Sequence, residues 1–389
     1  MFVYSAGSQS VKRTVQMADE SGQNNLLFTF ADKQAQQCAR HFCAQPQRNL
    51  IIDSGAYSTW SREEEIDLDE YIRFCGEILA IKKCNVEFIS LDVSLGSKED
   101  GFVPDEYKVE EACEKGWSNY TKLRAAGIPV IPVFHQFEDF DWLHRMAKDT
   151  KYISVSPRKR VVSQDLKIEW LGKVFSEVGL DVKIHGLGIS SSETLESFPF
   201  YSVDSSTWLE SSKGTFRYFD GRQAVCLSSD EWRTTSEEHR WDDGTDAVAE
   251  ARETYVPQGQ GGNYHFMKRA LEADVRLQRF LSALWDERGI RSGTTSPDEI
   301  SDEANYHLSL SADIYKEAKA AGGWRAVAAR RGLDPSYVQW AINLATQTAQ
   351  WRAYRGGETQ PEWLFDQLGW GRWNGQKSFR EYYTPNLAR

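Results

Sequence analysis

Polar residues that could do chemistry stand at the ends of four apolar segments of this sequence. They are Asp53 in LIIDS, Asp92 in FISLDV, His135 in PVFHQ and Asp204 in YSVDS. If these segments are parallel strands of a barrel, their carboxyl ends meet at one mouth, which is where such folds carry their chemistry. One ionised Asp could attack an anomeric carbon while a second group manages the proton of the leaving group. Each Asp could instead cap the helix that follows it.

Eight short β-rich segments precede residue 206 and alternate with stretches of helical periodicity. The helical pattern is clearest over 68–83, where apolar residues recur every three or four positions. Strands that alternate with helices predict a parallel sheet, and eight strands are the number that closes a TIM barrel. The expected strands are 2–6, 25–30, 49–54, 87–93, 128–134, 152–156, 182–187 and 200–205.

The expected fold is an α/β, TIM-like (β/α)8 barrel with an added α-helical C-terminal region. We expect the barrel over 1–225, a loop insertion or linker over 226–265, and the helical region over 266–389, because the middle segment is rich in charge, Gly and turn formers. A broad apolar stripe over 265–289 is suited to packing on a barrel wall. Since 187–200 holds only one short helical segment, a doubly wound open sheet is the alternative.

Two features of the C-terminal region could contact nucleic acid. The segment 322–347 is typical of two helices joined by a tight turn, as in DNA-binding helix-turn-helix motifs and in packed helical hairpins. We favour the packed hairpin, because Arg325, Arg330 and Arg331 are the only strong hint of DNA. The tail has four tryptophans that could stack on bases but that we assign to packing: Trp351, Trp363, Trp370 and Trp373.

The composition narrows the class of protein. A net charge of −11 over 389 residues argues against a generally basic surface, so a polynucleotide would be held by local patches. No apolar run approaches the roughly 20 residues of a membrane helix, and the N-terminus lacks the pattern of a signal peptide, which predicts a cytoplasmic protein with no membrane contact. The six cysteines form no C-x-x-C pair, which favours reduced thiols.

The strand ends resemble the tRNA-guanine transglycosylases and, more closely, their DNA-directed relatives in 7-deazaguanine DNA modification systems, the DpdA family. Residues 53–57, D-S-G-A-Y, are similar to that family's D-S-G-G-[FY] motif, and 203–208, V-D-S-S-T-W, resemble the region that bears its nucleophile. The resemblance implies that Asp204 is the attacking carboxylate. It also implies that Asp53 contacts the base and takes part in proton transfer, and that Tyr57 stacks on the base.

The same resemblance implies a base pocket built from three further segments. Asp92 lies where the family's second guanine-reading Asp is expected. The strand end His185, Gly186, Leu187, Gly188 resembles the family's G-G-L-[AG], whose backbone lines the pocket, with His185 in place of the first glycine. The family's V-Q-G strand end corresponds to 134–136, which assigns base recognition to His135 and Gln136.

Partners follow partly from what the sequence lacks. The tRNA enzymes carry a C-x-C-x-x-C…H zinc site beyond the nucleophile, whereas here only Cys226 follows Asp204, so we expect no metal and no cofactor. That difference, together with the different C-terminal region, favours DNA over tRNA as the partner. Phosphate contacts are assigned to four cations: Arg158, Lys159, Arg160 and Arg217. The oligomeric state is left open.

The expected activity is the replacement of guanine in DNA by a 7-deazaguanine base such as preQ0, through a covalent aspartyl-glycosyl intermediate. Three alternatives remain. The same exchange could act on tRNA or another RNA, the enzyme could simply hydrolyse the glycosidic bond, or the chain could be a non-catalytic nucleic-acid-binding protein with a degenerate barrel.

Overall fold

A computed structural model gives the structure of the chain. It describes residues 1–57, 65–93, 106–136, 138–157, 164–178, 182–256, 263–287, 317 and 324–332. The chain divides into two compact units, each described by itself below. The first unit comprises 1–157, 184–192 and 202–281, and the second comprises 158–183, 193–201 and 282–389.

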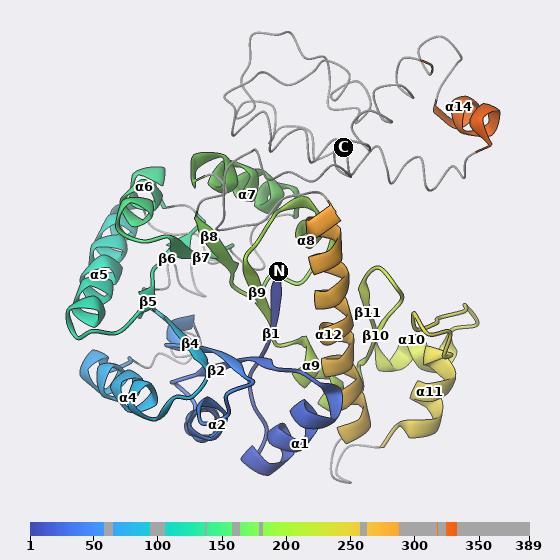
Figure 1. Ribbon diagram of the computed structural model, residues 1–389, viewed down its shortest axis with the longest axis horizontal. Helices are drawn as coiled ribbons and strands as arrows, with labels where there is room; N and C mark the ends of the chain where they lie inside the picture. Colours follow the sequence, from blue (N-terminus) through green and yellow to red (C-terminus); the bar gives the residue numbers. More distant parts are fainter. Residues whose placement is uncertain are drawn as a thin grey trace. The chain divides into compact units, whose positions relative to one another are not determined.

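The sheet is a parallel barrel whose strands occur close to the predicted segments (Figure 1). Its nine strands pair in the order β5-β4-β3-β2-β1-β9-β8-β7-β6. The TIM-like α/β fold predicted from the sequence is therefore confirmed. The strands are β1 (Phe2–Ala6), β2 (Asn25–Thr29), β3 (Asn49–Asp53), β4 (Asn85–Ile89), β5 (Val130–Ile131), β6 (Val133–His135), β7 (Tyr152–Ser156), β8 (Lys183–Gly186) and β9 (Ser202–Ser205).

Pro132 explains why nine strands form an eight-segment barrel. It divides the predicted strand 128–134 into β5 and β6, because proline has no N–H to donate to a sheet ladder. β5 pairs with β4, and β6 pairs with β7. The bonds on both sides of the break are kept, with Ser90 N donating to Ile131 O at 2.9 Å and Ser154 N to Pro132 O at 2.8 Å. β5 and β6, the two ends of the strand order, are therefore consecutive parts of one chain segment.

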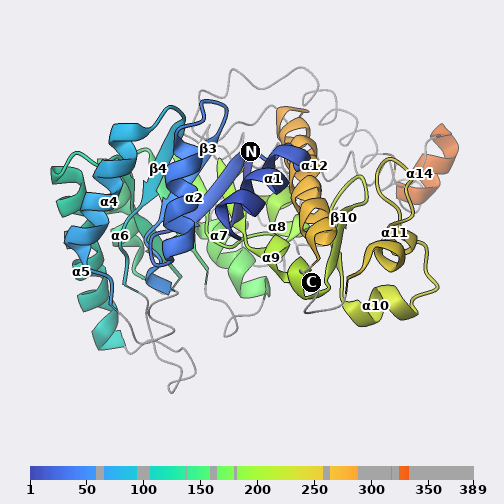
Figure 2. The same ribbon diagram turned by 90° about the horizontal axis from the view of Figure 1, so that it is seen from below.

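Helices alternate with the strands, as Figures 1 and 2 show. Asp residues cap several of them: the side chain of Asp32 accepts from Ala35 N, and that of Asp67 from Glu70 N. The helices up to the last strand are α1 (Val11–Ser21), α2 (Lys33–Cys43), α4 (Leu68–Ile81), α5 (Glu106–Ala125), α6 (Phe140–Asp149), α7 (Gln164–Val178) and α8 (Ser192–Ser197).

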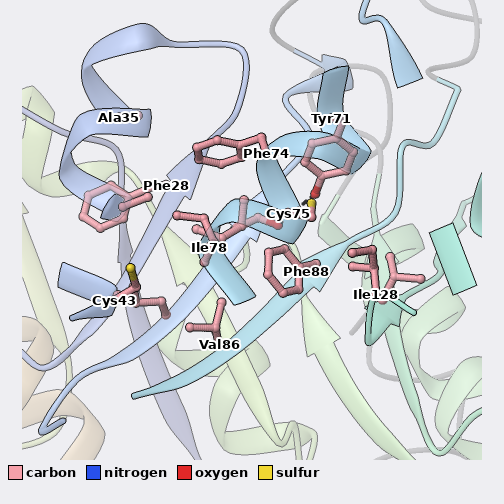
Figure 3. Close-up of a cluster of buried hydrophobic side chains, with 14 of the residues drawn as sticks. Phe28, Ala35, Cys43, Tyr71, Phe74, Cys75, Ile78, Val86, Phe88 and Ile128 are labelled. Carbon is pink, nitrogen blue, oxygen red and sulfur yellow. Dashed lines mark hydrogen bonds between the residues drawn. The ribbon is translucent and has the colours of Figure 1, made fainter. Parts of the chain in front are cut away.

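Two hydrophobic clusters lie on the two faces of the strands. Inside the barrel, Tyr4, Leu27, Ile51, Ile89 and Ile131 pack together across five strands. The outer cluster fills the space between strands and helices, and Figure 3 shows part of it. Side chains alternate between the two faces of a strand, so Asp53, two residues after Ile51, also points to the barrel interior. Asp204 points there too, because it pairs with Tyr4 in the sheet.

The helix α12 (Tyr264–Glu287) completes the barrel after an insertion. Val3 N donates to Gln278 Oε1 at 2.8 Å, and Ser5 Oγ to Asp274 Oδ2 at 2.8 Å, so α12 lies against β1. Its residues Met267 and Leu271 are buried in one cluster with Met17 of α1. The stretch of the predicted apolar stripe between Met267 and Gln278 thus packs on the barrel wall as expected.

The segment 226–265, expected to be a loop insertion or linker, contains two short helices in its described part. These helices pack with a hairpin that begins before residue 225. Phe216 of the hairpin and Trp232 of the insertion both contact Phe266 of α12, with ring centroids 4.8 and 6.0 Å apart. The elements between β9 and α12 are α9 (Thr207–Glu210), the 3-10 helix Ser211–Lys213, the hairpin strands β10 (Phe216–Phe219) and β11 (Ala224–Leu227), and the helices α10 (Ser229–Thr234) and α11 (Ala247–Thr254).

The second unit contains α7, α8, the end of α12 and α14 (Trp324–Arg331). Within it, Phe175 stacks on Phe198 with centroids 5.4 Å apart, and Trp285 Nε1 donates to Leu195 O at 3.1 Å. Of the predicted helical pair 322–347, the structure describes only the first helix, and the four tail tryptophans lie outside the described residues. No helix among the described residues is long and apolar enough to span a membrane.

Candidate active site

The four polar residues singled out in the sequence stand at the carboxyl end of the barrel. Asp53 and His135 are the last residues of β3 and β6, Asp204 lies in β9, and Asp92 follows β4 by three residues. The charges of Asp92 and Asp204 both raise the pKa of Asp53, which places the three carboxyl groups within electrostatic range of one another. The barrel therefore gathers them at one mouth.

Asp53 is held by a turn that only glycine can complete. Gly55 has φ +86°, and its N–H donates to Asp53 Oδ2 at 3.1 Å. A Cβ at Gly55 would lie 2.4 Å from both Ala31 Cβ and Thr29 Oγ1. The glycine of the D-S-G-A-Y motif is therefore required by backbone geometry and by close approach.

The environment of Asp53 favours its protonated form. Burial raises its pKa, the charges of Asp92 and Asp204 raise it further, and hydrogen bonds from Gly55 and Ser54 oppose these effects, with a result of about 7. A carboxyl with this pKa can give up or take a proton near neutral pH. This is the property that general acid-base catalysis needs.

Asp204 is held through one of its two carboxylate oxygens. Gly188, with φ +61°, donates its N–H to Asp204 Oδ1 at 2.8 Å. His185 Nε2 lies 3.4 Å from the same oxygen, outside hydrogen-bond geometry. The strand end predicted to line a base pocket with its backbone therefore also holds Asp204.

The His185 side chain does not reach the surface. It is fully buried, and its Nδ1 lies 2.7 Å from Ser202 Oγ, which in turn lies 2.6 Å from the hydroxyl of Tyr152. The edge of its ring meets Tyr4 at a centroid distance of 6.3 Å. The imidazole therefore packs behind Asp204, and the prediction for this strand end, that its backbone lines a base pocket, stays a prediction.

Asp92 belongs to a second cluster around a histidine. His135 Nε2 lies 2.8 Å from Asp92 Oδ2, and its Nδ1 lies 2.6 Å from Glu138 Oε1. Burial by itself lowers the pKa of His135, but the charges and hydrogen bonds of Glu138 and Asp92 outweigh it and raise the pKa to about 10. At neutral pH His135 is therefore a cation between two carboxylates. It orients Asp92 and has no ring nitrogen left for a base.

A cavity adjoins this cluster on the helix side of the strands. Asp92, His135 and Glu138 line it together with the rings of Trp117 of α5 and Trp142 of α6. Two buried oxygens that border it, Ser90 Oγ and Glu138 Oε2, have no hydrogen-bond partner. Sequence reasoning missed Glu138, whose only signal is its place three residues after a strand-end histidine.

The remaining predicted base contacts differ in exposure. The Tyr57 side chain is 57% exposed at the end of the described segment after β3, so its ring can meet a ligand. Gln136 is buried, and its N–H donates to Ser156 O at 3.1 Å. Gly186, Leu187 and Gly188 lie at the carboxyl end of β8, next to Asp204.

The predicted phosphate contacts are only partly described. Arg158, Lys159 and Arg160 lie outside the described residues. Arg217 is described, and its assignment to phosphate binding is wrong: it is buried and pairs at 2.9 Å with Asp274, which is also buried. Within the described part of the chain, no three His, Cys, Asp or Glu side chains come together as a metal site would require.

The solved structures that resemble this fold include a distant one. No protein-family model and no curated protein matches the chain. A solved structure described as a 4-hydroxy-2-oxoglutarate aldolase/2-deydro-3-deoxyphosphogluconate aldolase from TTHB1 is similar over 53% of this chain and 84% of that chain, at 10% identity and a TM-score of 0.33. A likeness of this size assigns no activity, and the fold rests on the strand order itself.

Proposed function

We propose that the protein is an enzyme, a base-exchanging transglycosylase that replaces guanine in DNA by a 7-deazaguanine such as preQ0. The observation that carries the proposal is the pair Asp53 and Asp204 at one barrel mouth. The pKa of Asp53 is raised to about 7, partly by the charge of Asp204. Two carboxyl groups in different environments are what a proton donor and a nucleophile require.

In the first step Asp204 forms an ester with the sugar. Because Gly188 N–H occupies Oδ1, Oδ2 is the oxygen that attacks C1′ of the deoxyguanosine. The C1′–N9 bond breaks, its electron pair goes to the guanine, and protonated Asp53 supplies a proton to the departing base. The products are free guanine, a glycosyl ester on Asp204 and ionised Asp53.

The second step restores a glycosidic bond. Ionised Asp53 takes the proton from the N9–H of the incoming deazaguanine, and that nitrogen attacks C1′. The ester C–O bond breaks, and its electron pair returns to Asp204 as a carboxylate. Both residues end as they began, and nothing is oxidised or reduced.

Recognition of the base falls to residues beside this pair. Asp92 keeps an oxygen that His135 does not contact and that can accept N–H groups of a guanine edge. Tyr57 offers an exposed ring for stacking. If the substrate is duplex DNA, the nucleotide must leave the stack to reach Asp204, at a cost of a few kcal/mol.

A trapping experiment tests the proposal. The protein is mixed with guanine-containing DNA or with tRNA, denatured, and examined by mass spectrometry for a nucleic-acid adduct, while labelled preQ0 reports exchange. We expect an adduct and incorporation with DNA, and neither with Asp204→Ala. The matched control is Asp220→Ala, which removes an exposed turn carboxylate of the β10–β11 hairpin.

The other outcomes identify the alternatives. Adduct and incorporation with tRNA alone would move the same chemistry to RNA. Release of free guanine without incorporation would indicate a hydrolase. Nucleic-acid binding that Asp204→Ala leaves intact, with no adduct in the wild type, would indicate a binding protein with a degenerate barrel.

A further inference from the structure

Three side chains on neighbouring strands, of which Ser202 and His185 are buried, form a line that ends at Asp204. Tyr152 of β7 contacts Ser202 of β9 at 2.6 Å, and Ser202 contacts His185 Nδ1 of β8 at 2.7 Å. His185 Nε2 then lies 3.4 Å from Asp204 Oδ1. This nitrogen is fully buried and has no hydrogen-bond partner. The proposed chemistry makes no use of the first three residues.

The chemistry of the groups sets the direction of donation along this line. A phenol is a stronger donor and a weaker acceptor than an alkyl hydroxyl, so Tyr152 donates to Ser202. Ser202 then has its own proton left for His185 Nδ1, which accepts it. The ring proton of His185 therefore sits on Nε2, facing a carboxylate that can only accept.

We propose that His185 is a positioning residue that presents its Nε2–H to Asp204 Oδ1, with Ser202 and Tyr152 fixing the tautomer. The inference rests on the proposed function. Gly188 N–H already binds the same oxygen at 2.8 Å, so a small shift that completes the His185 contact gives Oδ1 two donors. Oδ2 is left as the attacking atom.

This arrangement acts differently on the two steps. When the ester forms, the negative charge on Asp204 disappears and the two donors lose a charged acceptor. When the ester breaks, negative charge returns to the carboxylate of Asp204, including Oδ1, which Gly188 and His185 both face, so the two donors stabilise the departing carboxylate. His185 therefore favours release of the sugar from Asp204 over its capture.

The orientation can be measured without any substrate. In ¹⁵N-histidine-labelled protein, the His185 ring is assigned by its disappearance in His185→Gln, one of seven histidines. We expect a protonated Nε2 and an unprotonated Nδ1 in the wild type. In Ser202→Ala we expect a mixture of the two tautomers. Protonation of Nδ1 in the resting wild-type protein overturns the inference.

The role in the reaction is tested by measuring two rates separately in Ser202→Ala. The rate of adduct formation is measured without incoming base, and the rate of adduct decay after adding preQ0. We expect decay to slow about tenfold and formation to stay the same or to rise, since one hydrogen bond is worth about that factor. The matched control is Ser154→Ala, a buried serine of β7 whose hydroxyl has no partner. Both of its rates should stay within about twofold of wild type.

The outcomes separate this inference from the proposed function. Equal slowing of formation and decay in Ser202→Ala indicates a merely structural role and overturns the inference, as do unchanged rates. A wild-type protein that forms no adduct and exchanges no base overturns the proposed function and the kinetic part of the inference with it. The tautomer measurement then still decides the orientation of His185.

Discussion

Two carboxylates at the barrel mouth each have a histidine beside them, and the two histidines are held in opposite ways. His135 lies between Asp92 and Glu138, at 2.8 and 2.6 Å, and its pKa is raised to about 10. His185 has one carboxylate near it, Asp204, and a serine hydroxyl on its other nitrogen. Asp92 therefore pairs with a cation, whereas Asp204 is held by the backbone N–H of Gly188.

The difference fits two separate tasks in the proposed reaction. A carboxylate that attacks carbon would lose reactivity beside a full positive charge, because the charge stabilises the carboxylate before it reacts. A carboxylate that only accepts hydrogen bonds from a base keeps its function when a cation fixes its orientation. In the proposed reaction, the comparison therefore assigns covalent attack to Asp204 and recognition of the base to Asp92.

The largest effect expected is that of Asp204→Asn. The amide oxygen can still accept from Gly188 N–H, so the local structure is kept, but the side chain cannot form the ester. We expect base exchange to fall at least about 10⁴-fold, as for loss of other nucleophiles. Labelled-base incorporation measures the rate, and urea unfolding checks the fold. More than about 1% residual exchange would contradict the assignment of Asp204 as the nucleophile.

Asp53→Asn tests the effect of the two neighbouring carboxylates, Asp92 and Asp204, on the pKa of Asp53. The folded pKa of Asp53 is about 7 against an ordinary 3.8, so the folded chain holds this proton more tightly than the unfolded chain. The free energy of unfolding should therefore fall as the pH rises from about 4 through 7. The limit is about 4 kcal/mol, and Asp53→Asn should remove this slope. Urea unfolding at several pH values measures it, and an unchanged slope in the variant would refute this explanation.

Asp92→Asn should leave the covalent chemistry in place and weaken recognition. The substitution replaces an acceptor by an amide that can also donate, which is wrong for a guanine edge. We expect kcat/KM for exchange to fall about 10²-fold, while an adduct with DNA still forms. The same trapping experiment, run with Asp204→Asn beside it, checks this. Loss of the adduct in both variants would remove the distinction between the two carboxylates.

The fold could be predicted because its strands are short apolar runs bounded by turn residues. Seven of the barrel segments lie within two residues of their predicted starts, and Pro132 only divides another. The insertion was harder, because its helices α10 and α11 are too short to show a clear period. It is held by contacts distant in sequence, such as Arg269 and Arg276 against the ring of Trp241.

The candidate site was predictable where a residue ends a strand, and not elsewhere. Asp53 and Asp204 stand out because polar residues that close apolar runs are visible in the sequence. Ser202 and Tyr152 read as ordinary strand residues, since nothing local shows that they face one histidine. Arg217 was misassigned for a related reason: the buried Asp274 that compensates its charge is distant in sequence, so nothing near Arg217 indicates its burial.

The smallest effect expected is that of Glu138→Gln, on the Asp92 side alone. The raised pKa of His135 stabilises the folded protein fully below about 6.5, and this contribution is lost as the pH rises through about 10. Without the charge of Glu138 we expect the pKa of His135 to move toward its ordinary value. NMR titration of the His135 ring measures the shift.

Activity should follow that titration. At pH 7 we expect Glu138→Gln to lower exchange less than about tenfold, and at pH 9 to lower it further, because His135 loses its charge and Asp92 its fixed orientation. The matched control is Glu114→Gln, which changes an exposed glutamate on α5. If the loss is the same at both pH values, Glu138 supports the local packing and does not act through the charge of His135. The contrast between Asp92, which pairs with a cation, and Asp204, which is held by an N–H group, would then fail for Asp92.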